Sequence, residues 1–312
     1  MNEKIDYEQL EKRIGRAHLR QRLDIQMYHS SRILGQGLTL FHFENLTFFH
    51  AFIHFVLRAC GLFNRGNRNA CDIQVVQNPV RIKGLPKAFS GYRILQISDL
   101  HLDLHPEITE ALISSVEGVN YDLCVLTGDF RAATYGDYLP AMKGARKLLP
   151  RLKQPVYGVL GNHDFIEEVP ILEDLGVKML LNESALIERD GSKLILVGLD
   201  DAHYYQVDNF HQACENLDQG DVSILLSHSP ETYRQAASFS FDYMLSGHTH
   251  GGQICLPGGI PVLTNGNCPR RLARGPWKYR HIQGYTSRGA GCSAVPVRFC
   301  CPPEITIHTL LG

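Results

Sequence analysis

The sequence lacks an excess of charge of either sign. Its 312 residues include 31 basic and 32 acidic side chains, which give a formal net charge of −1. A chain that binds nucleic acid usually concentrates basic residues into a strongly positive surface. We therefore expect no nucleic-acid partner.

The cysteines lack the spacing of a metal site. None of the nine belongs to a Cys-x-x-Cys pair, so a cysteine-ligated structural metal is disfavoured. Their number is odd, and Cys124 lies inside an apolar run typical of a buried strand. Both features indicate reduced thiols and a cytoplasmic setting.

Long hydrophobic runs are also missing. A helix that crosses a bilayer needs about 20 mainly apolar residues, but the uninterrupted part of the most apolar segment covers only residues 46–57. That segment, residues 38–63, carries seven phenylalanines and starts too late for a signal peptide. We expect it to form a helix lying in a membrane interface. The alternatives are a helix packed on the main domain, or one that lines an apolar substrate groove.

The chain is expected to divide near residue 70. Residues 1–34 have a loosely amphipathic helical pattern, and the Gly/Asn/Arg-rich segment 64–69 predicts a linker. We therefore predict a helical, membrane-interfacial extension over residues 1–70 and a main domain over residues 71–312. The second part is long enough to bury a substantial core in one α/β unit.

Apolar runs and polar motifs alternate through the main domain. The strand-like runs are residues 92–98, 122–127, 156–160, 222–227 and 241–246. The motifs that follow them are Asp99-Leu100-His101, Gly128-Asp129, Gly161-Asn162-His163-Asp164, Ser227-His228 and Gly247-His248-Thr249-His250. Further strands are predicted at 73–82 (an edge strand, because it contains Asn78-Pro79), 193–199, 260–263, 281–286 and 296–309, and helices at 107–116 and 139–152.

The five motifs supply carboxylate, amide and imidazole ligands. Such ligands suit Mn, Fe, Zn or Mg, and no thiolate takes part. Side chains at the ends of strands converge in one crevice of an α/β sheet. A single Asp-x-His or Gly-Asp usually marks an ordinary turn. All five motifs in one order, each behind a strand, predict a two-metal phosphoesterase site.

This order of motifs resembles the calcineurin-like metallophosphoesterase family, and in particular its bacterial membrane-associated branch. The resemblance covers roughly residues 72–311, including LSGHTHGGQICLP at 245–257 and YTSRGAGCSAVPVRFCCPPEI at 285–305. It implies an α/β fold in which two β-sheets pack face to face between outer helices, with the metals at one edge of the sandwich.

The resemblance also implies roles for the motif residues. One metal would be held by Asp99, His101 and His250, the other by Asn162, His228 and His248, and Asp129 would bridge the two ions. Two such ions stabilise the attacking and leaving oxygens of an in-line displacement, so no covalent protein intermediate is needed. Manganese is the preferred ion, with iron, zinc or magnesium as alternatives.

Two neighbouring residues are candidate catalytic groups. By resemblance His163 contacts the phosphate and protonates the leaving group; the alternative is that it only orients a ligand. Arg131 is either a bidentate phosphate donor or a solvated arginine. Ser/Thr protein phosphatases carry an Asp and an Arg where this chain has Ala132 and Ala133, so the chain looks unlike a protein phosphatase.

The substrate is expected to be nucleotide-linked or lipid-linked. Residues 269–278 (PRRLARGPWK) hold the only tryptophan, Trp277, in a basic segment that either binds a second phosphate and stacks on a base, or is a plain solvated loop. His203 is expected on the surface or in the core, with the edge of the site as an alternative.

By resemblance, the expected reaction is hydrolysis of UDP-2,3-diacylglucosamine to 2,3-diacylglucosamine 1-phosphate and UMP. The alternative is a generic phosphodiesterase or phosphomonoesterase acting on small soluble esters. We expect a peripheral location on the cytoplasmic face of the inner membrane, or a cytoplasmic one if the N-terminal helix packs on the domain. No protein partner is inferred.

Overall fold

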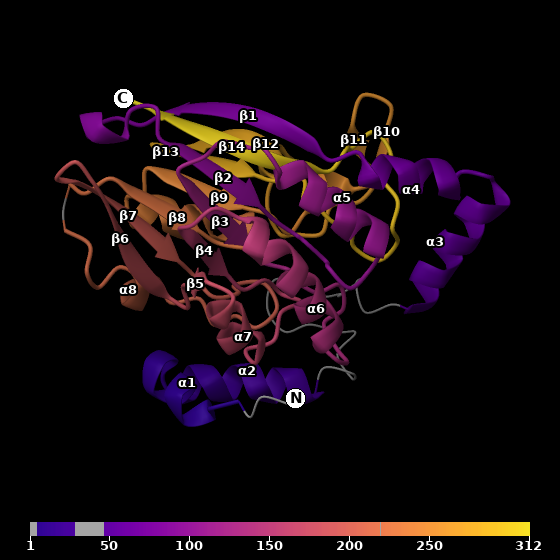
Figure 1. Ribbon diagram of the computed structural model, residues 1–312, viewed down its shortest axis with the longest axis horizontal. Helices are drawn as coiled ribbons and strands as arrows, with labels where there is room; N and C mark the ends of the chain where they lie inside the picture. The colour runs from indigo at the N-terminus through magenta and orange to yellow at the C-terminus, as the bar shows by residue number, and fades with distance from the viewer. Residues whose placement is uncertain (1–4, 29–46, 219) are drawn as a thin grey trace.

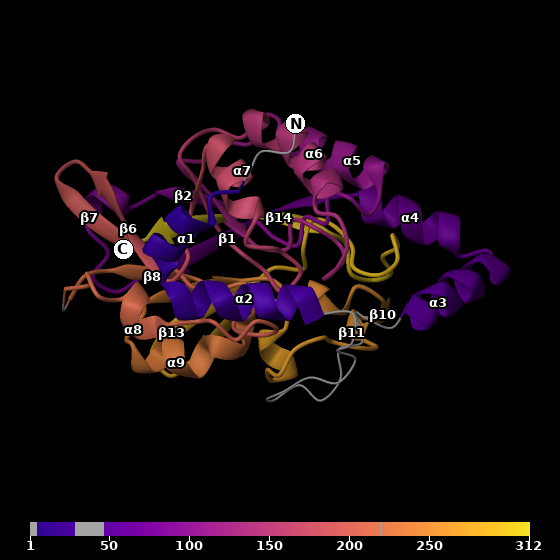
Figure 2. The same cartoon turned by 90° about the horizontal axis from the view of Figure 1, so that it is seen from below.

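The computed structural model describes residues 5–28, 47–218 and 220–312. In this part of the chain two six-stranded sheets pack face to face, with helices on their outer sides (Figures 1 and 2). This is the predicted α/β sandwich. The strands predicted before the five motifs all form, within one or two residues of their expected ends.

The first sheet has the order β1-β14-β2-β3-β4-β5. Its strands are β1 (Gln74–Arg81), β14 (Glu304–Leu311), β2 (Arg93–Ile97), β3 (Leu123–Thr127), β4 (Val156–Val159) and β5 (Val177–Met179). Strands β2, β3, β4 and β5 run parallel to one another, so the segments that follow them start at the same edge of the sheet. The strand containing Pro79 lies at the edge of the sheet, as predicted, where a missing N–H donor costs little.

The second sheet has the order β12-β13-β9-β8-β7-β6. Its strands are β12 (Gly275–Tyr279), β13 (Ile282–Thr286), β9 (Tyr243–Ser246), β8 (Ser223–Leu226), β7 (Ser192–Gly198) and β6 (Glu183–Arg189). A small hairpin, β10 (Cys255–Leu256) and β11 (Ile260–Pro261), stands apart from both sheets. The predicted strand 296–309 is shorter than expected, because strand geometry begins only at Glu304.

Three apolar clusters hold the layers together. Leu123 and Val125 of the first sheet meet Leu196 and Leu245 of the second between the two sheets. The outer face of the first sheet is covered by α5 (Pro106–Val116), α6 (Leu139–Leu148) and α7 (Glu168–Asp174), and that of the second by α8 (Phe210–Ala213) and α9 (Tyr233–Ser238). Short 3-10 turns lie at Lys87–Phe89, Leu149–Arg151, Pro230–Thr232, His250–Gly252 and Arg270–Leu272.

The first two helices, α1 (Tyr7–Ile14) and α2 (Arg16–Tyr28), confirm the helical pattern near the N-terminus. They pack on the sandwich, because Leu10, Ile14 and Leu19 are buried in the cluster that α5 and α6 share. Figure 2 shows α2 lying between α6 and α7 on one side and α8 and α9 on the other. The domain boundary at residue 70 stays a prediction.

The predicted linker at 64–69 is wrong, because these residues form most of α4 (Phe63–Cys71). A β-carbon on Gly66 would lie 2.7 Å from Phe299 and Val297, so the helix sits directly against the C-terminal segment. Asn67 and Asn69 donate to the carbonyl oxygens of Pro296 and Arg298. Tertiary contacts of this kind override the low helix propensity of Gly and Asn.

The aromatic segment 38–63 is described only from residue 47 onward. There it forms α3 (Thr47–Ala59), which projects from one end of the sandwich in both views (Figures 1 and 2). Residues of α3 and of the segment around the β10–β11 hairpin line the same cavity. Among the described residues, no helix has the length and hydropathy that crossing a bilayer would need. Residues 38–46 lie outside the described part of the chain.

Candidate metal centre

The loops after five strands bring the predicted ligands together. β2 leads to Asp99 and His101, β3 to Asp129, β4 to Asn162, β8 to His228, and β9 to His248 and His250. All seven side chains are buried. Asp99, His101, Asp129, His248 and His250 have left-handed backbones with φ between 43° and 71°. Such strain in non-glycine residues is concentrated at functional sites, where the surrounding fold maintains it.

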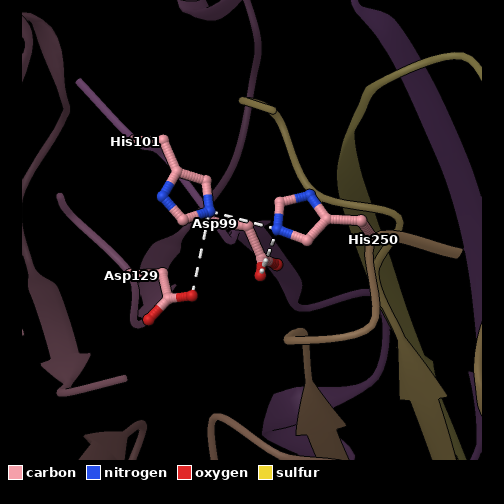
Figure 3. A group of neighbouring side chains, drawn as sticks. All are labelled: Asp99, His101, Asp129 and His250. Carbon is pink, nitrogen blue, oxygen red and sulfur yellow. Dashed lines mark hydrogen bonds and ion pairs between the residues drawn. The ribbon is translucent and has the colours of Figure 1, made fainter. Parts of the chain in front are cut away.

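One group of donor atoms comes from Asp99, His101, Asp129 and His250 (Figure 3). The Nε2 atoms of His101 and His250 are 3.1 Å apart. His250 Nε2 lies 3.4 Å from Asp99 Oδ1, and His101 Nε2 lies 3.8 Å from Asp129 Oδ2. Four potential donor atoms from three loops therefore lie within 4.8 Å of one another.

A second group surrounds the amide of Asn162. Its Oδ1 lies 2.9 Å from His228 Nε2 and 2.8 Å from His248 Nδ1. His228 Nε2 is also 3.3 Å from Asp129 Oδ2. The Asp129 carboxylate therefore adjoins both groups, which is the position expected of a bridging ligand.

The chemistry of these donors fits divalent metal ions. The Asp99 Oδ2 atom and the Asn162 side-chain nitrogen are buried and have no hydrogen-bond partner among the described residues, although buried polar atoms normally have one. A cation would use the carboxylate oxygen. The set contains only carboxylate, amide and imidazole groups, which suit Mn, Fe, Zn or Mg.

Backbone carbonyls orient two of the imidazoles. His101 Nδ1 donates to the carbonyl oxygen of Arg131, and His228 Nδ1 donates to that of Thr127, both at 2.7 Å. Because a carbonyl can only accept, Nδ1 of each ring carries a proton, and Nε2 is the atom that would bind a metal. In the metal-free centre burial opposes protonation of His228, but the charge of Asp129 outweighs it and raises the pKa of His228 to about 10, so metal binding at this ring would displace a proton. Metal-binding histidines are commonly oriented in this way.

Burial and neighbouring charges set the ionisation of the centre. Burial opposes ionisation of Asp129, but His228 and His163 outweigh it and hold the pKa of Asp129 well below its usual value. Burial and the charge of Asp129 raise the pKa of Asp164 to about 6. Burial also holds the pKa values of His248 and His250 well below normal, which keeps both rings neutral and able to bind a metal.

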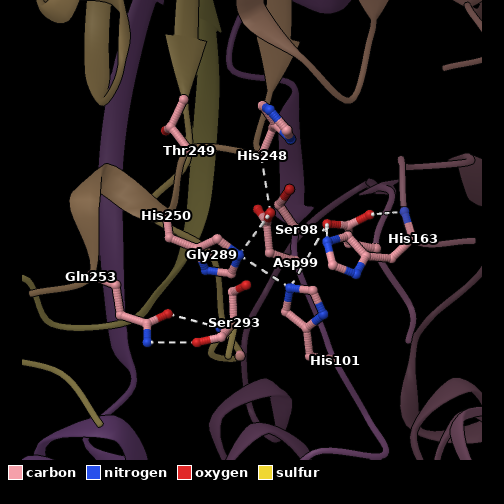
Figure 4. Close-up of polar contacts among 12 residues, drawn as sticks. Ser98, Asp99, His101, His163, His248, Thr249, His250, Gln253, Gly289 and Ser293 are labelled. Atoms are coloured by element: carbon pink, nitrogen blue, oxygen red, sulfur yellow. Dashed lines mark hydrogen bonds and ion pairs between the residues drawn. The ribbon is translucent and has the colours of Figure 1, made fainter. Parts of the chain in front are cut away.

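His163 lies beside the ligands, as predicted (Figure 4). Its ring centroid is 5.3 Å from that of His101, and its Nε2 is 3.9 Å from Asp129 Oδ2. Its backbone N–H donates to Asp129 Oδ1 at 3.0 Å. The side chain borders the cavity described below, where a substrate would reach it. Its catalytic role stays a prediction.

Arg131 is not a solvated arginine, because its side chain is fully buried. A terminal nitrogen donates to the carbonyl oxygens of Tyr135 and Gly136, and the guanidinium lies 3.9 Å over the ring of Phe165. It is absent from the residues lining the cavity at the metal centre. Its contact with a phosphate stays a prediction.

Trp277 is not available to stack on a base, which corrects the expectation for residues 269–278. It belongs to β12, it is only 6% exposed, and its indole N–H donates to Thr286 Oγ1 at 2.9 Å. Its ring packs so closely on Gly284 that a β-carbon there would lie 2.1 Å away. The aromatic ring fills the core beneath α9 rather than a substrate site.

His203 lies closer to the centre than the sequence alone indicates. Its ring centroid is 4.2 Å from that of His248, and its Nδ1 is 3.0 Å from Glu231 Oε1. His203, Glu231 and His248 form a further group, separate from the two described above, whose donor atoms lie within 4.8 Å of one another. The available signal was the segment Asp200-Asp201-Ala202-His203, which has three polar residues and comes directly after a predicted strand.

A cavity of about 480 Å³ opens onto the metal centre. Asp129, His163, His248 and His250 border it at one end. The remaining wall is mostly apolar and comes from α3, from the region of the β10–β11 hairpin and from the segment before β14. Its apolar residues are Phe52, Ile53, Val56, Leu57, Ile254, Val262, Leu263, Ala294 and Val295, and its other residues are Thr249, Gly252, Gln253, Asn265 and Ser293. Gln253 links two segments of this wall, because its side chain donates to the carbonyl oxygens of Ser293 and Val295. Helix α3 therefore lines an apolar groove, which was one of the predicted alternatives.

The fold and this centre define a metal-dependent phosphoesterase. Residues 92–252 match the family model for calcineurin-like phosphoesterases, and the chain belongs to that family. The uncharacterized metallophosphoesterase YkoQ of Bacillus subtilis is 31% identical over 258 residues, covering 79% of this chain and 93% of the relative. YkuE of the same organism, also an uncharacterized metallophosphoesterase, is 30% identical over 76% of this chain and 85% of its own.

A vertebrate protein is similar as well. The transmembrane protein with metallophosphoesterase domain of Danio rerio is 27% identical over 275 residues, covering 80% of this chain and 59% of that protein. Taken with the buried Asp/His cluster, these relationships identify the chain as a metal-dependent phosphoester hydrolase.

Proposed function

We propose that the chain hydrolyses a phosphodiester or pyrophosphate bond in a substrate that carries acyl chains, with UDP-2,3-diacylglucosamine as the best candidate. The observation that supports this proposal is the cavity at the metal centre. One end is bordered by Asp129 and His163, and most of the remaining wall is apolar. A substrate with a phosphate at one end and hydrocarbon at the other matches this distribution.

The residues of the centre would have distinct roles in this reaction. Asp99, His101 and His250 would hold one divalent ion, Asn162, His228 and His248 the other, with Asp129 between them. When bound, the ions would supply charge stabilisation and an activated water. His163 would donate a proton to the leaving oxygen, because it lies beside Asp129 and borders the cavity. Manganese is the ion we propose.

We also propose that the mouth of this cavity contacts a membrane surface, which would supply the acylated substrate. Phe55 of α3 is 68% exposed, and Val262 beside the hairpin is 60% exposed. Leu256 of β10, Ile260 of β11 and Leu263 add exposed apolar area, and the hairpin that these two strands form lies near α3 in Figure 2. Clusters of exposed apolar side chains of this kind typically mark an interaction surface. The name of the Danio rerio relative also places its phosphoesterase domain in a membrane protein.

The substrate proposal is tested by hydrolysis with added Mn²⁺. The substrates are detergent-dispersed UDP-2,3-diacylglucosamine, its deacylated form, and bis-p-nitrophenyl phosphate. We expect UMP from the acylated compound at a kcat/KM at least tenfold above that of the deacylated one. Equal rates on both nucleotide sugars would favour the alternative, a generic phosphodiesterase or phosphomonoesterase of small soluble esters.

Two variants of α3 test the role of the cavity and the membrane contact independently. Val56 lines the cavity, whereas Phe55 does not border it and is more exposed. We expect Val56→Asp to raise KM for the acylated substrate about tenfold or more, because it puts a charge in an apolar wall, while leaving turnover of the chromogenic ester within twofold. Phe55→Asp should instead weaken flotation with anionic phospholipid vesicles. Unchanged flotation of Phe55→Asp would contradict the membrane proposal.

A further inference from the structure

The N-terminal helix α2 carries an arginine that is completely buried. Arg22 Nε donates to Asp200 Oδ2 at 2.8 Å, and its two terminal nitrogens donate to Asp200 Oδ1 and to the carbonyl oxygen of Asp164, the latter at 3.0 Å. The guanidinium lies 4.1 Å over the ring of Tyr205. A buried ion pair often stabilises a fold no better than apolar side chains of similar volume. Its distinctive contribution is to fix the relative positions of the groups that it joins.

One partner of Arg22 leads to the bridging carboxylate. The Asp164 carboxylate accepts the backbone N–H groups of Asp129 at 2.8 Å, Phe130 at 2.7 Å and Gly161 at 2.7 Å. It thereby ties the turn after β4 to the turn after β3. Arg22 holds the backbone of the residue that makes these contacts, so α2 is connected to Asp129 through a single residue.

The other partner leads toward His248. Asp200 Oδ1 accepts the backbone N–H of Asp201 at 2.8 Å. The Asp201 carboxylate in turn accepts those of His203 at 3.1 Å and of Tyr204 at 2.7 Å. This loop after β7 therefore fixes His203, whose ring lies against His248.

We infer that Arg22 is a positioning residue for the metal centre, because it joins the loop after β4 in the first sheet to the loop after β7 in the second. Ligands from both sheets must keep a common geometry for two ions to be held. The helix that carries Arg22 crosses the sandwich between the two helical layers, which suits this role (Figure 2). The inference rests on the two-metal assignment proposed above.

The test compares Arg22→Met with Arg20→Met in the full-length protein. Arg20 lies on the same helix, but its side chain is 74% exposed and forms an ion pair with the exposed Asp24. Calorimetric titration of the metal-free proteins with Mn²⁺, and the visible spectrum of the Co²⁺ form, report on the centre without a substrate. We expect Arg22→Met to weaken Mn²⁺ binding about 10- to 100-fold, the usual effect of losing an outer partner of a metal site.

Kinetics on bis-p-nitrophenyl phosphate at saturating Mn²⁺ give a second readout. Arg22→Met should lower kcat at least tenfold with KM within threefold, whereas Arg20→Met should match the wild type. Arg22→Lys keeps the charge but cannot contact Asp200 with two nitrogens. It should therefore retain more stability than Arg22→Met while its Co²⁺ spectrum and kcat remain altered.

A double variant distinguishes positioning from a purely structural role. Arg22→Met with Asp200→Leu removes both buried charges, so a positioning role predicts that the unfolding temperature recovers while the Mn²⁺ affinity does not. Recovery of the affinity together with stability, or normal Mn²⁺ binding by Arg22→Met or Arg22→Lys, would overturn the inference. The number of ions bound by the wild type tests the two-metal assignment separately; fewer than two ions would refute both.

Discussion

The Nε2 atoms of His101 and His250 face each other at 3.1 Å, and their rings are stacked with centroids 5.0 Å apart. His101 already donates its Nδ1 proton to a carbonyl, so its Nε2 lone pair points at the second ring. Burial and the neighbouring His101 and Arg298 hold the pKa of His250 well below normal, so a positive charge on this ring does not relieve the contact. The two rings share a hydrogen bond when His250 carries its proton on Nε2, and a cation bound by both nitrogens would take its place.

Removal of metal should therefore destabilise the folded chain. A ligand that binds only the native state adds about 2.7 kcal/mol at a free concentration one hundred times its dissociation constant. Differential scanning calorimetry should compare protein freed of metal by a chelator with the same protein after Mn²⁺ is added back. The unfolding temperature should be several degrees higher with Mn²⁺. Equal unfolding temperatures in the two forms would argue against metal binding at this centre.

Replacement of the shared carboxylate tests whether the two donor groups form one centre. Asp129→Asn keeps the size of the side chain but removes the charge that lies between the two groups. We expect bound metal to fall below two ions per chain by elemental analysis and turnover to drop to background. Asp103→Asn is a suitable control, because Asp103 accepts a backbone N–H nearby without belonging to the donor groups. Near-normal turnover of Asp129→Asn would contradict the bridging assignment.

His163→Ala tests the proposed proton donor. Its ring approaches Asp129 without belonging to the first group of donor atoms, so the variant should keep its metal content. Turnover of an ester with a poor leaving group should fall by about 10² to 10⁴, the usual contribution of general acid catalysis. An ester with a good leaving group, such as p-nitrophenolate, should be affected much less. Loss of metal from this variant would instead indicate that His163 orients a ligand.

The sequence predicted the strands of the centre because their signals are local. Buried runs such as residues 123–127 and 243–246 are apolar up to the last residue, and a single glycine separates each of these two from its predicted ligand. Parallel strands then carry these ligands to one edge by geometry alone. The positions of Asp99, Asp129 and His248 therefore follow from strand order and motif order together.

The features that sequence reasoning missed depend on partners distant in the chain. The helix at residues 63–71 is stabilised by Phe299, more than two hundred residues away, so its Gly/Asn composition was misleading. Trp277 sits in a basic segment, yet packing on Gly284 in the paired strand buries it. The contact of Arg22 with Asp200 spans 178 positions, and no local pattern near either residue indicates it.

His308 of β14 should make the stability of the metal-free protein depend on pH. The ring is fully buried; its Nε2 donates to Gln96 Oε1 at 3.0 Å, and its Nδ1 accepts from the Tyr243 hydroxyl at 2.9 Å. Burial lowers its pKa to about 3, whereas an unfolded chain has a histidine pKa of about 6.5. Below that value the unfolded state binds a proton that the folded state does not, so stability falls as the pH drops toward 3.

The expected loss is about 1.4 kcal/mol for each pH unit below 6.5, or about 2 kcal/mol by pH 5. Urea unfolding of the chelated protein between pH 8 and pH 5 measures it, and His308→Gln isolates the contribution of this ring from those of the carboxylates. The variant should lose less stability than the wild type over this interval, because glutamine can keep a hydrogen bond and does not titrate. Parallel curves for the two proteins would show that His308 is protonated as readily in the folded state as in the unfolded one.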